Sequence, residues 1–436
     1  MKSVQKITLA ILIAANFCVL SIGQAAVNLV GVGTEGIYEK DSQGALWGVS
    51  RTLGRAKKIV KFTGKRGKYT PTTYSSSFVP KLKALGGSNV HNKDGYIDQI
   101  WPLPNGSVLF SADVNGKNYL YKLNPKTNSV GNNKPKGNKA GYNNRQAVMN
   151  IGQSKGIHHS DIRALHQRSL LIANYKGKPP VLFFGEYNAR KGRVIGAAGD
   201  AVTLWKSLDM GDTWSKVIAW NTTGHQTDHI YGLKQNPYNG WIYLLFGDDT
   251  REAGIVAWDG KSLAPPDNTA IASMKRYKGW KSIAGTASVR TGDITFTKNR
   301  CIWMPSLDFL STQNTSADGF LHSQQANFDL TNQQQGGKVP YQNNIPPILG
   351  LTATNGDIYW ASYRSKSLAE QKLHVWKSIN AGVSWSVTKI NIYNTWTSVP
   401  TNLLITPWGE LAVSGRGILF NKNKNAATGT TAYLTR

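Results

Sequence analysis

The sequence predicts an all-β fold built from repeated units, and two observations support that prediction. A short apolar strand recurs along the chain at steps of 53 to 73 residues, a spacing typical of repeated structural units. The composition agrees, because 436 residues include 44 glycines, 14 tryptophans and 18 tyrosines, as in chains with many strands and turns. No segment predicts a helix longer than a turn or two. The recurrent strand begins at Leu46, Val108, Val181, Ile242, Ile302, Ile358 and Leu411.

The clearest copy of the repeat is His225–Asp249, which predicts two strands joined by a turn at Asn236–Gly240. Five copies carry glycine two positions before the first aliphatic residue, where a tight turn needs a positive φ. Cys301 lies in such a strand, and we expect it in the core. Two polar tracts, Pro125–Asn144 and Gln324–Asn344, are expected to be a long loop and an insertion.

The first 25 residues resemble a secretory signal. Lys2 and Lys6 precede an apolar run from Ile7 to Ile22, and small residues follow it. We therefore expect residues 1–25 to be removed and residues 26–436 to form a single domain that is secreted or periplasmic. No later run is long enough to span a bilayer.

The chain is strongly basic. It has 51 Lys and Arg residues against 24 Asp and Glu residues, a formal net charge of +27. No acidic residue lies between Asp41 and Asp94 or between Asp113 and Asp161. Such a surface attracts polyanions, and for an exported protein we expect an acidic polysaccharide rather than nucleic acid. A merely solvated basic surface is the alternative.

Two segments, Trp205–Trp214 and Trp376–Trp385, share the pattern W-K-S-x-[DN]-x-G-x-[ST]-W. They resemble the Asp-box (BNR) repeat of sialidase-like β-propellers, which closes the turn between the third and fourth strands of a blade. With the repeat, this resemblance implies one β-propeller domain of seven four-stranded blades over residues 26–436. In that family the box is structural and lies on the face away from the active site. The Arg-Ile-Pro segment of true sialidases does not occur in this sequence.

Propeller geometry would bring the entries of first strands and the ends of second strands together at one mouth of the central channel. Cleavage of a uronate polymer by β-elimination needs a cation for the carboxylate, a base and an acid, which Arg, His and Tyr supply. Hydrolysis instead needs two carboxyl groups. The candidate catalytic residues are His159, His229, Tyr187, Arg190, Arg251, Glu186 and Asp248; the candidate substrate-binding residues are His158, Asp161, His225, Asp228, Tyr231, Asp249, Tyr363 and Arg364.

Three functions therefore stay open: an exported enzyme cleaving an acidic glycan by β-elimination, which we favour; a sialidase-like glycoside hydrolase; and a non-catalytic glycan-binding propeller of the envelope. In architecture the chain resembles polysaccharide lyases with histidine and tyrosine at the channel mouth. No cofactor is predicted, and we expect a monomer. Zinc or calcium held by His158 or His159 with His229 is a further alternative, whereas His225 and His229 would be about 13 Å apart along a strand.

Overall fold

The computed structural model describes most of the predicted strands and the turns at one end of them. The described residues are 27–28, 35–52, 55–65, 68–74, 96–114, 117–130, 147–151, 167–186, 201–221, 227, 229–247, 253–284, 289–304, 320–325, 334–338, 347–362, 372–391, 399–416 and 431–434. The predicted signal segment, residues 1–25, lies outside them.

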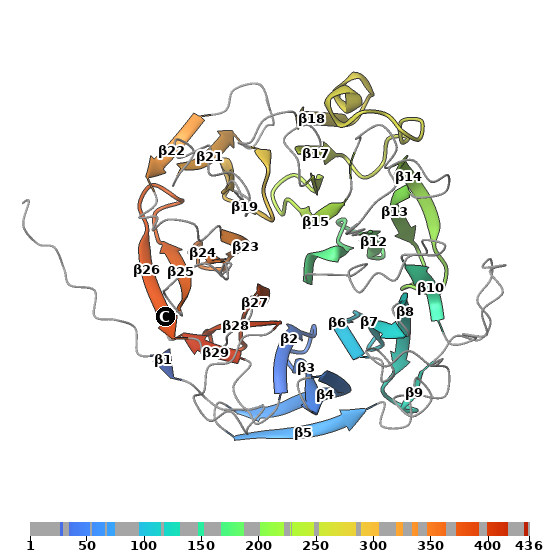
Figure 1. The fold of residues 1–436 in the computed structure, drawn as a ribbon, viewed down its shortest axis with the longest axis vertical. Helices are drawn as coiled ribbons and strands as arrows, with labels where there is room; N and C mark the ends of the chain where they lie inside the picture. Colours follow the sequence, from blue (N-terminus) through green and yellow to red (C-terminus); the bar gives the residue numbers. More distant parts are fainter. Residues whose placement is uncertain are drawn as a thin grey trace, which may run out of the picture.

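The described strands form seven antiparallel sheets arranged in a ring around one axis (Figure 1). In six of the sheets the strand that comes first along the chain lies nearest the axis and the later strands follow outward; in the seventh, β27 lies nearest the axis and β1, from the start of the chain, lies outermost. The prediction of an all-β propeller is confirmed. The first three sheets are β2 Glu35–Lys40, β3 Leu46–Thr52, β4 Arg55–Lys65 and β5 Lys68–Tyr74; β6 Tyr96–Pro102, β7 Val108–Val114, β8 Lys117–Asn124, β9 Ser129–Val130 and β10 Ala147–Ile151; and β11 Leu170–Ala173, β12 Val181–Gly185, β13 Ala201–Ser207 and β14 Ser215–Asn221.

Four further sheets complete the ring. The seventh sheet contains strands from both ends of the chain, because β1 pairs with β29. In this pair Val27 lies opposite Leu434 and Asn28 lies opposite Tyr433. These sheets are β15 Ile230–Gln235, β16 Ile242–Phe246, β17 Gly254–Trp258 and β18 Trp280–Ala284; β19 Ile294–Phe296, β20 Arg300–Trp303, β21 Phe320–Gln325 and β22 Gln334–Lys338; β23 Pro347–Thr352, β24 Ile358–Ser362, β25 Lys372–Ser378 and β26 Ser386–Asn391; and β27 Val399–Ile405, β28 Leu411–Arg416, β29 Thr431–Leu434 and β1 Val27–Asn28.

The described part of the chain also contains two 3-10 helices: η1 Gln167–Ser169 directly precedes β11, and η2 Ile271–Arg276 lies in the connection between β17 and β18. Within the described residues, no helix combines the length and the apolar character needed to cross a bilayer.

Two expectations about strands were wrong. Four strands were expected in every sheet, but the second sheet has a fifth, β9, which pairs with β8 at the start of the expected loop Pro125–Asn144. The tract Gln324–Asn344 was expected to be an insertion, but it contains β22, the fourth strand of the fifth sheet. β9 and β22 are outermost strands, with no neighbouring strand on one side. The sequence of β22 is polar and β9 has only two residues, so the hydrophobic pattern that predicts strands is absent from them.

The predicted glycine turns are confirmed. The five glycines that precede the second strand of a sheet all have a positive φ, between 77° and 91°. They lie in the turns that join the first strand of a sheet to the second, at one end of the ring. These glycines are Gly44, Gly106, Gly240, Gly356 and Gly409.

The two Asp-box segments form the same turn, each between the third and fourth strands of its sheet. In the first, the Gly211 N–H donates to the Ser207 hydroxyl (2.8 Å) and the Thr213 N–H donates to the Asp209 carboxylate (2.9 Å). In the second, the corresponding bonds from Gly382 and Ser384 are both 2.9 Å. An amide therefore replaces the carboxylate of the first box without loss of the turn.

Apolar side chains from neighbouring sheets meet between the sheets. Between the fourth and fifth sheets, Tyr243 and Phe296 are in contact at 4.8 Å between ring centroids, and Cys301 is buried in the same cluster. The Tyr243 hydroxyl lies 3.8 Å from the Cys301 sulfur, and burial raises the pKa of that thiol to about 12. The prediction that Cys301 is a core residue is confirmed, and its thiol stays protonated at neutral pH.

Candidate functional site

The structure describes three of the predicted site residues: Glu186, His229 and Tyr231. For the others the proposed roles stay predictions. The candidates that lie outside the described residues are His158, His159, Asp161, Tyr187, Arg190, His225, Asp228, Asp248, Asp249, Arg251, Tyr363 and Arg364.

Glu186 directly follows β12, and its carboxylate turns toward β13 of the same sheet. One oxygen accepts from the Thr203 N–H and the other from the Trp205 indole N–H, both at 2.9 Å. Burial raises the pKa of Glu186 from its ordinary value of 4.5 to about 7, although both hydrogen bonds lower it. Glu186 is therefore a carboxyl group that is partly protonated near neutral pH, as a general acid requires.

His229 and Tyr231 lie at the start of β15. The histidine is 2% exposed, and its ring meets the Tyr231 ring edge-on at 5.3 Å between centroids. Tyr231 in turn packs against the apolar cluster between the fourth and fifth sheets. At this position His229 is a buried side chain, so a substrate would have to reach it through a deep opening.

The backbone brings Glu186 and β15 together, since the Ile230 N–H donates to the Glu186 carbonyl oxygen at 3.0 Å. The side chains diverge. Glu186 bonds to Trp205, which packs between the second and third sheets, whereas Tyr231 packs between the fourth and fifth. These contacts place the described carboxylate and the histidine–tyrosine pair against different sheet interfaces.

A second set of polar groups lies around a cavity of about 310 Å³ on the ring axis. All seven sheets line it, mostly through the innermost strands. The lining residues include both ends of innermost strands, because Leu170 begins β11 and Lys40 ends β2, and Asp293 directly precedes β19. The cavity is thus part of the central channel, and its size suits one sugar-sized group.

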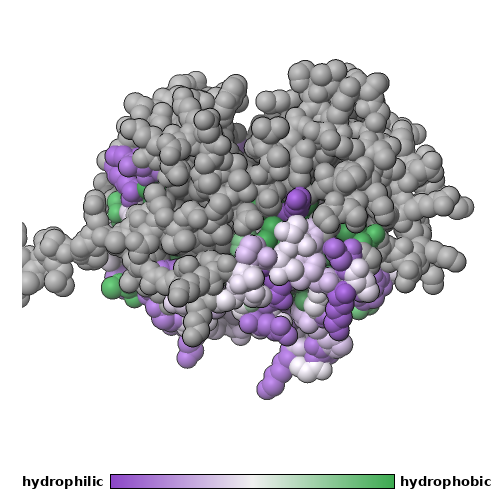
Figure 2. All heavy atoms as spheres, turned by 90° about the horizontal axis from the view of Figure 1, so that it is seen from below, coloured by the Kyte–Doolittle hydropathy of each residue, from purple (hydrophilic) through white to green (hydrophobic). Residues whose placement is uncertain are grey.

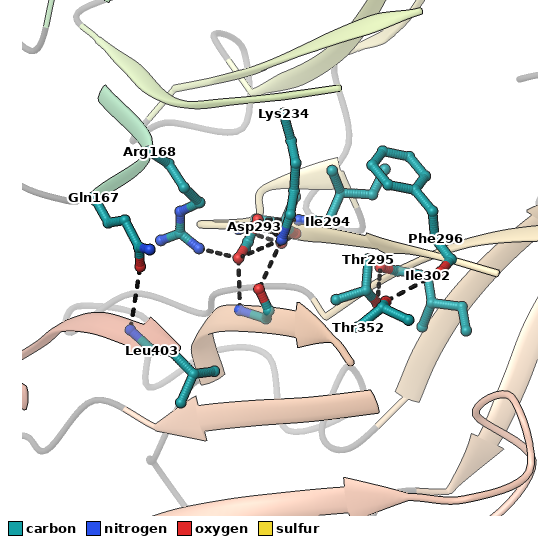
Figure 3. Close-up of polar contacts among 12 residues, drawn as sticks. Gln167, Arg168, Lys234, Asp293, Ile294, Thr295, Phe296, Ile302, Thr352 and Leu403 are labelled. Carbon is teal, nitrogen blue, oxygen red and sulfur yellow. Dashed lines mark hydrogen bonds and ion pairs between the residues drawn. The ribbon is translucent and has the colours of Figure 1, made fainter. Parts of the chain in front are cut away.

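Asp293 is the centre of this set (Figure 3). It is 1% exposed and forms ion pairs with Arg168, from η1, and Lys234, from β15, whose nitrogen lies 3.2 Å from each carboxylate oxygen. The Gly350 N–H donates to Asp293 at 2.6 Å, and Lys234 donates to the Gly350 carbonyl oxygen at 2.7 Å. Four sheets, the third to the sixth, meet at one carboxylate.

Gln167 links the third sheet to the other side of the channel. Its amide nitrogen donates to the Glu39 carboxylate at 2.6 Å, and its amide oxygen accepts from the Leu403 N–H at 3.2 Å. Its backbone oxygen accepts from the Trp101 indole at 2.7 Å. The first, second and seventh sheets are thereby tied to the residue next to Arg168.

The charged residues that line the cavity favour an anionic group. Lys40, Arg168 and Lys234 carry three positive charges, against two from Glu39 and Asp293, a difference of +1. Burial raises the pKa of Glu39, although its hydrogen bonds with the Lys40 N–H and Gln167 lower it. Burial also lowers the pKa of Arg168 and Lys234, although the Asp293 charge opposes this. A ligand carboxylate in the cavity would meet guanidinium and ammonium groups, the usual partners of carboxylates.

Sequence reasoning missed this cluster because its members come from different sheets with no common spacing. One signal was available. Lys234 lies in the first strand predicted within His225–Asp249, next to Leu233, and Asp293 begins another strand that the sequence predicts, Asp293–Thr297. A charged residue at such a position in a propeller faces either a sheet interface or the channel, and only the channel accommodates several charges.

Among the described residues, no group of three or more His, Cys, Asp or Glu side chains is arranged to hold a metal ion. The alternative that uses His158 or His159 involves residues outside that part of the chain.

Comparison with known proteins identifies no family. No family model matches the chain, and no curated protein does so significantly. Solved structures with a similar overall course include a virginiamycin B lyase from Staphylococcus aureus with quinupristin (10% identity, 93% of this chain and 98% of that one, TM-score 0.46) and a periplasmic gluconolactonase of Pseudomonas aeruginosa (10%, 92% and 95%, TM-score 0.44). A third is a Penicillium chrysogenum α-L-arabinanase with arabinobiose (14%, 77% and 91%, TM-score 0.40). Likenesses this distant carry no argument about function.

Proposed function

We propose that the protein is an exported, monomeric enzyme that cleaves an acidic, uronate-containing polysaccharide. The observation that supports this most directly is the excess of positive charge around the channel cavity, where Arg168 and Lys234 flank Asp293. A sugar carboxylate bound there would share the two cations with Asp293. The net charge of +27 would draw the polymer toward the protein before binding.

Elimination is the reaction that this charge distribution suits best. Removal of the C5 proton places negative charge next to the uronate carboxylate, and nearby cations stabilise that charge. The electron pair then forms the C4–C5 double bond as the glycosidic oxygen leaves with a proton, so no water is consumed. We assign the base and acid to His159, His229 and Tyr187, the residues that the sequence predicts; His229 is buried, so this role requires the polymer to reach a buried ring.

Hydrolysis is the second candidate, and Glu186 is the observation that favours it. Its pKa of about 7 is that of a general acid near neutral pH. Its partner would be Asp248 or Asp249. A glycan-binding propeller without catalysis would use the same cationic channel.

The test is to incubate the mature protein with uronate-containing and neutral polysaccharides while following ultraviolet absorbance of unsaturated ends together with new reducing ends. We expect both to rise on a uronate polymer only. New ends without absorbance would mean hydrolysis, and binding without new ends would mean a binding protein.

Two variants test the role of the channel. Lys234→Gln should reduce turnover of the uronate polymer at least tenfold. Lys58→Gln, which removes an exposed lysine of β4 away from the channel, should not. Equal activity of the two folded variants would remove the channel cations from the mechanism.

A further inference from the structure

The connection between β17 and β18, residues 259–279, presents an aliphatic side chain to solvent. Leu263 is 91% exposed, the highest value among the exposed large apolar side chains of the described residues. Tyr277, in the same connection, is also exposed. This segment joins the third and fourth strands of its sheet, so it lies at the end of the ring where the Asp-box turns lie. We call that end the turn face.

The exposure of Leu263 is imposed by a fixed backbone. The Trp280 indole donates to the Leu263 carbonyl oxygen at 3.0 Å, and the Trp258 indole donates to the Ser262 carbonyl oxygen at 3.1 Å. Asp259 accepts from the N–H groups of Lys261 and Ser262, both at 2.8 Å. The two tryptophan rings stack on each other at 5.0 Å. These bonds hold the backbone of residues 259–263 in the position where the Leu263 side chain is exposed.

Exposed cations surround this side chain. Lys261, Lys275, Arg276 and Lys278 are all exposed, whereas the acidic groups of the connection are occupied, because Asp259 caps its own turn and Asp267 forms an ion pair with Lys216. Figure 2, which views the ring from the side of the first two sheets, shows that hydrophilic side chains also project along the lower edge of the molecule there. The segment thus combines a rigid apolar tip, a tyrosine and a cationic border.

We propose that residues 259–279 dock the protein on an anionic lipid surface, with Leu263 inserted among the acyl chains and the cations at the headgroups. This combination is typical of interfacial membrane binding. An acidic polysaccharide would satisfy the cations but not Leu263, since an aliphatic side chain offers sugars neither a hydrogen bond nor an aromatic face. Leu208 and Tyr238, exposed in other turns of the same face, would lie near the membrane with it. The docking is independent of the reaction proposed above.

The test is flotation of the mature protein with phosphatidylcholine vesicles that contain or lack phosphatidylglycerol. We expect binding only to the anionic vesicles. Leu263→Ser should weaken it at least tenfold, and Leu263→Trp should preserve it. The triple variant Lys275→Gln, Arg276→Gln, Lys278→Gln should weaken it by roughly a hundredfold, since each cation near an anionic surface contributes about fivefold. Lys58→Gln is the matched control and should bind like the wild type.

Two results would overturn the docking proposal: no binding to anionic vesicles, or binding that survives both Leu263→Ser and the triple variant. If a soluble uronate polymer binds the same lysines regardless of Leu263, the segment is a glycan site instead. Cleavage of soluble polymer by the docking variants should be unchanged, so that failure of docking and failure of the proposed reaction are distinguished.

Discussion

Asp293 determines how the positive charges of the channel are arranged. Its carboxylate holds Arg168 and Lys234 together and accepts from the Gly350 N–H. Without that carboxylate two cations would be left in the interior, and breaking such a pair by removing one partner typically costs about 3–5 kcal/mol. The same pairing keeps the cations in place for a ligand. Asp293 is therefore a positioning residue in the proposed function.

Glu186 makes the protein's stability depend on pH. Its pKa is about 7 in the folded protein against 4.5 ordinarily, so between these pH values the folded state binds more protons than the unfolded state. The stability it contributes is complete below pH 4.5 and is lost as the pH rises through 7. Glu186→Gln should remove this loss, which is on the order of 3 kcal/mol over the window.

Denaturant unfolding of wild type and Glu186→Gln at several pH values measures this difference. Glu39, whose pKa is also raised by burial, contributes with the same sign and should leave part of the slope in the variant. A variant whose stability falls with pH as steeply as the wild type would contradict the raised pKa.

At the residue scale, the sequence predicted what depends on local geometry. The positive φ of Gly240 and the burial of Cys301 follow from their neighbours in the chain, and both were confirmed. The cluster of Arg168, Lys234 and Asp293 was not predicted, because it depends on which sheets face each other across the axis.

At the scale of elements, the two Asp-box turns pack closely against the preceding sheet. Gly211 has a φ of 85°, and a Cβ there would lie 2.9 Å from a methyl group of Leu109 in the second sheet. Gly382 meets Ile302 of the fifth sheet at the same distance. Glycine is required at this position of the box for two reasons: the backbone has a positive φ, and the neighbouring sheet leaves no room for a Cβ.

Gly211→Ala should therefore lower the free energy of unfolding by on the order of 2–3 kcal/mol. Gly106→Ala is the matched control, because its φ is 83° but a Cβ there would have no neighbour within 4 Å. It should cost about 1 kcal/mol from conformation alone. Chemical unfolding of the two variants compares these costs directly, and equal losses would show that the contact with Leu109 contributes nothing.

Strands such as Ile242–Phe246 were predictable because all five residues are apolar or aromatic, and all five are buried. β22, with the sequence QQGGK, was not. It gains its place from backbone pairing with β21 rather than from its side-chain pattern, and no periodicity in the sequence could reveal that.

At the scale of the whole molecule, the ring depends on a connection between the two ends of the chain. The propeller followed from the repeat and the Asp-box turns, but the closure did not, because a two-residue strand has no periodicity. β1 supplies the outermost strand of the seventh sheet by pairing with β29. It begins at Val27, so removal of residues 1–25 would leave the strand in the mature chain.

A chain that begins at Glu35 should consequently unfold at a lower temperature than one that begins at Ala26. Loss of β1 leaves β29 as an unpaired edge, and the seventh sheet then holds the ring only through its inner strands. Removal of residues 435–436, which follow β29, is the control and should change the melting temperature little. Scanning calorimetry of the three chains measures the effect. Equal melting temperatures would mean that the ring closes without β1, through the apolar packing of the first sheet against the seventh and through the bonds of Gln167.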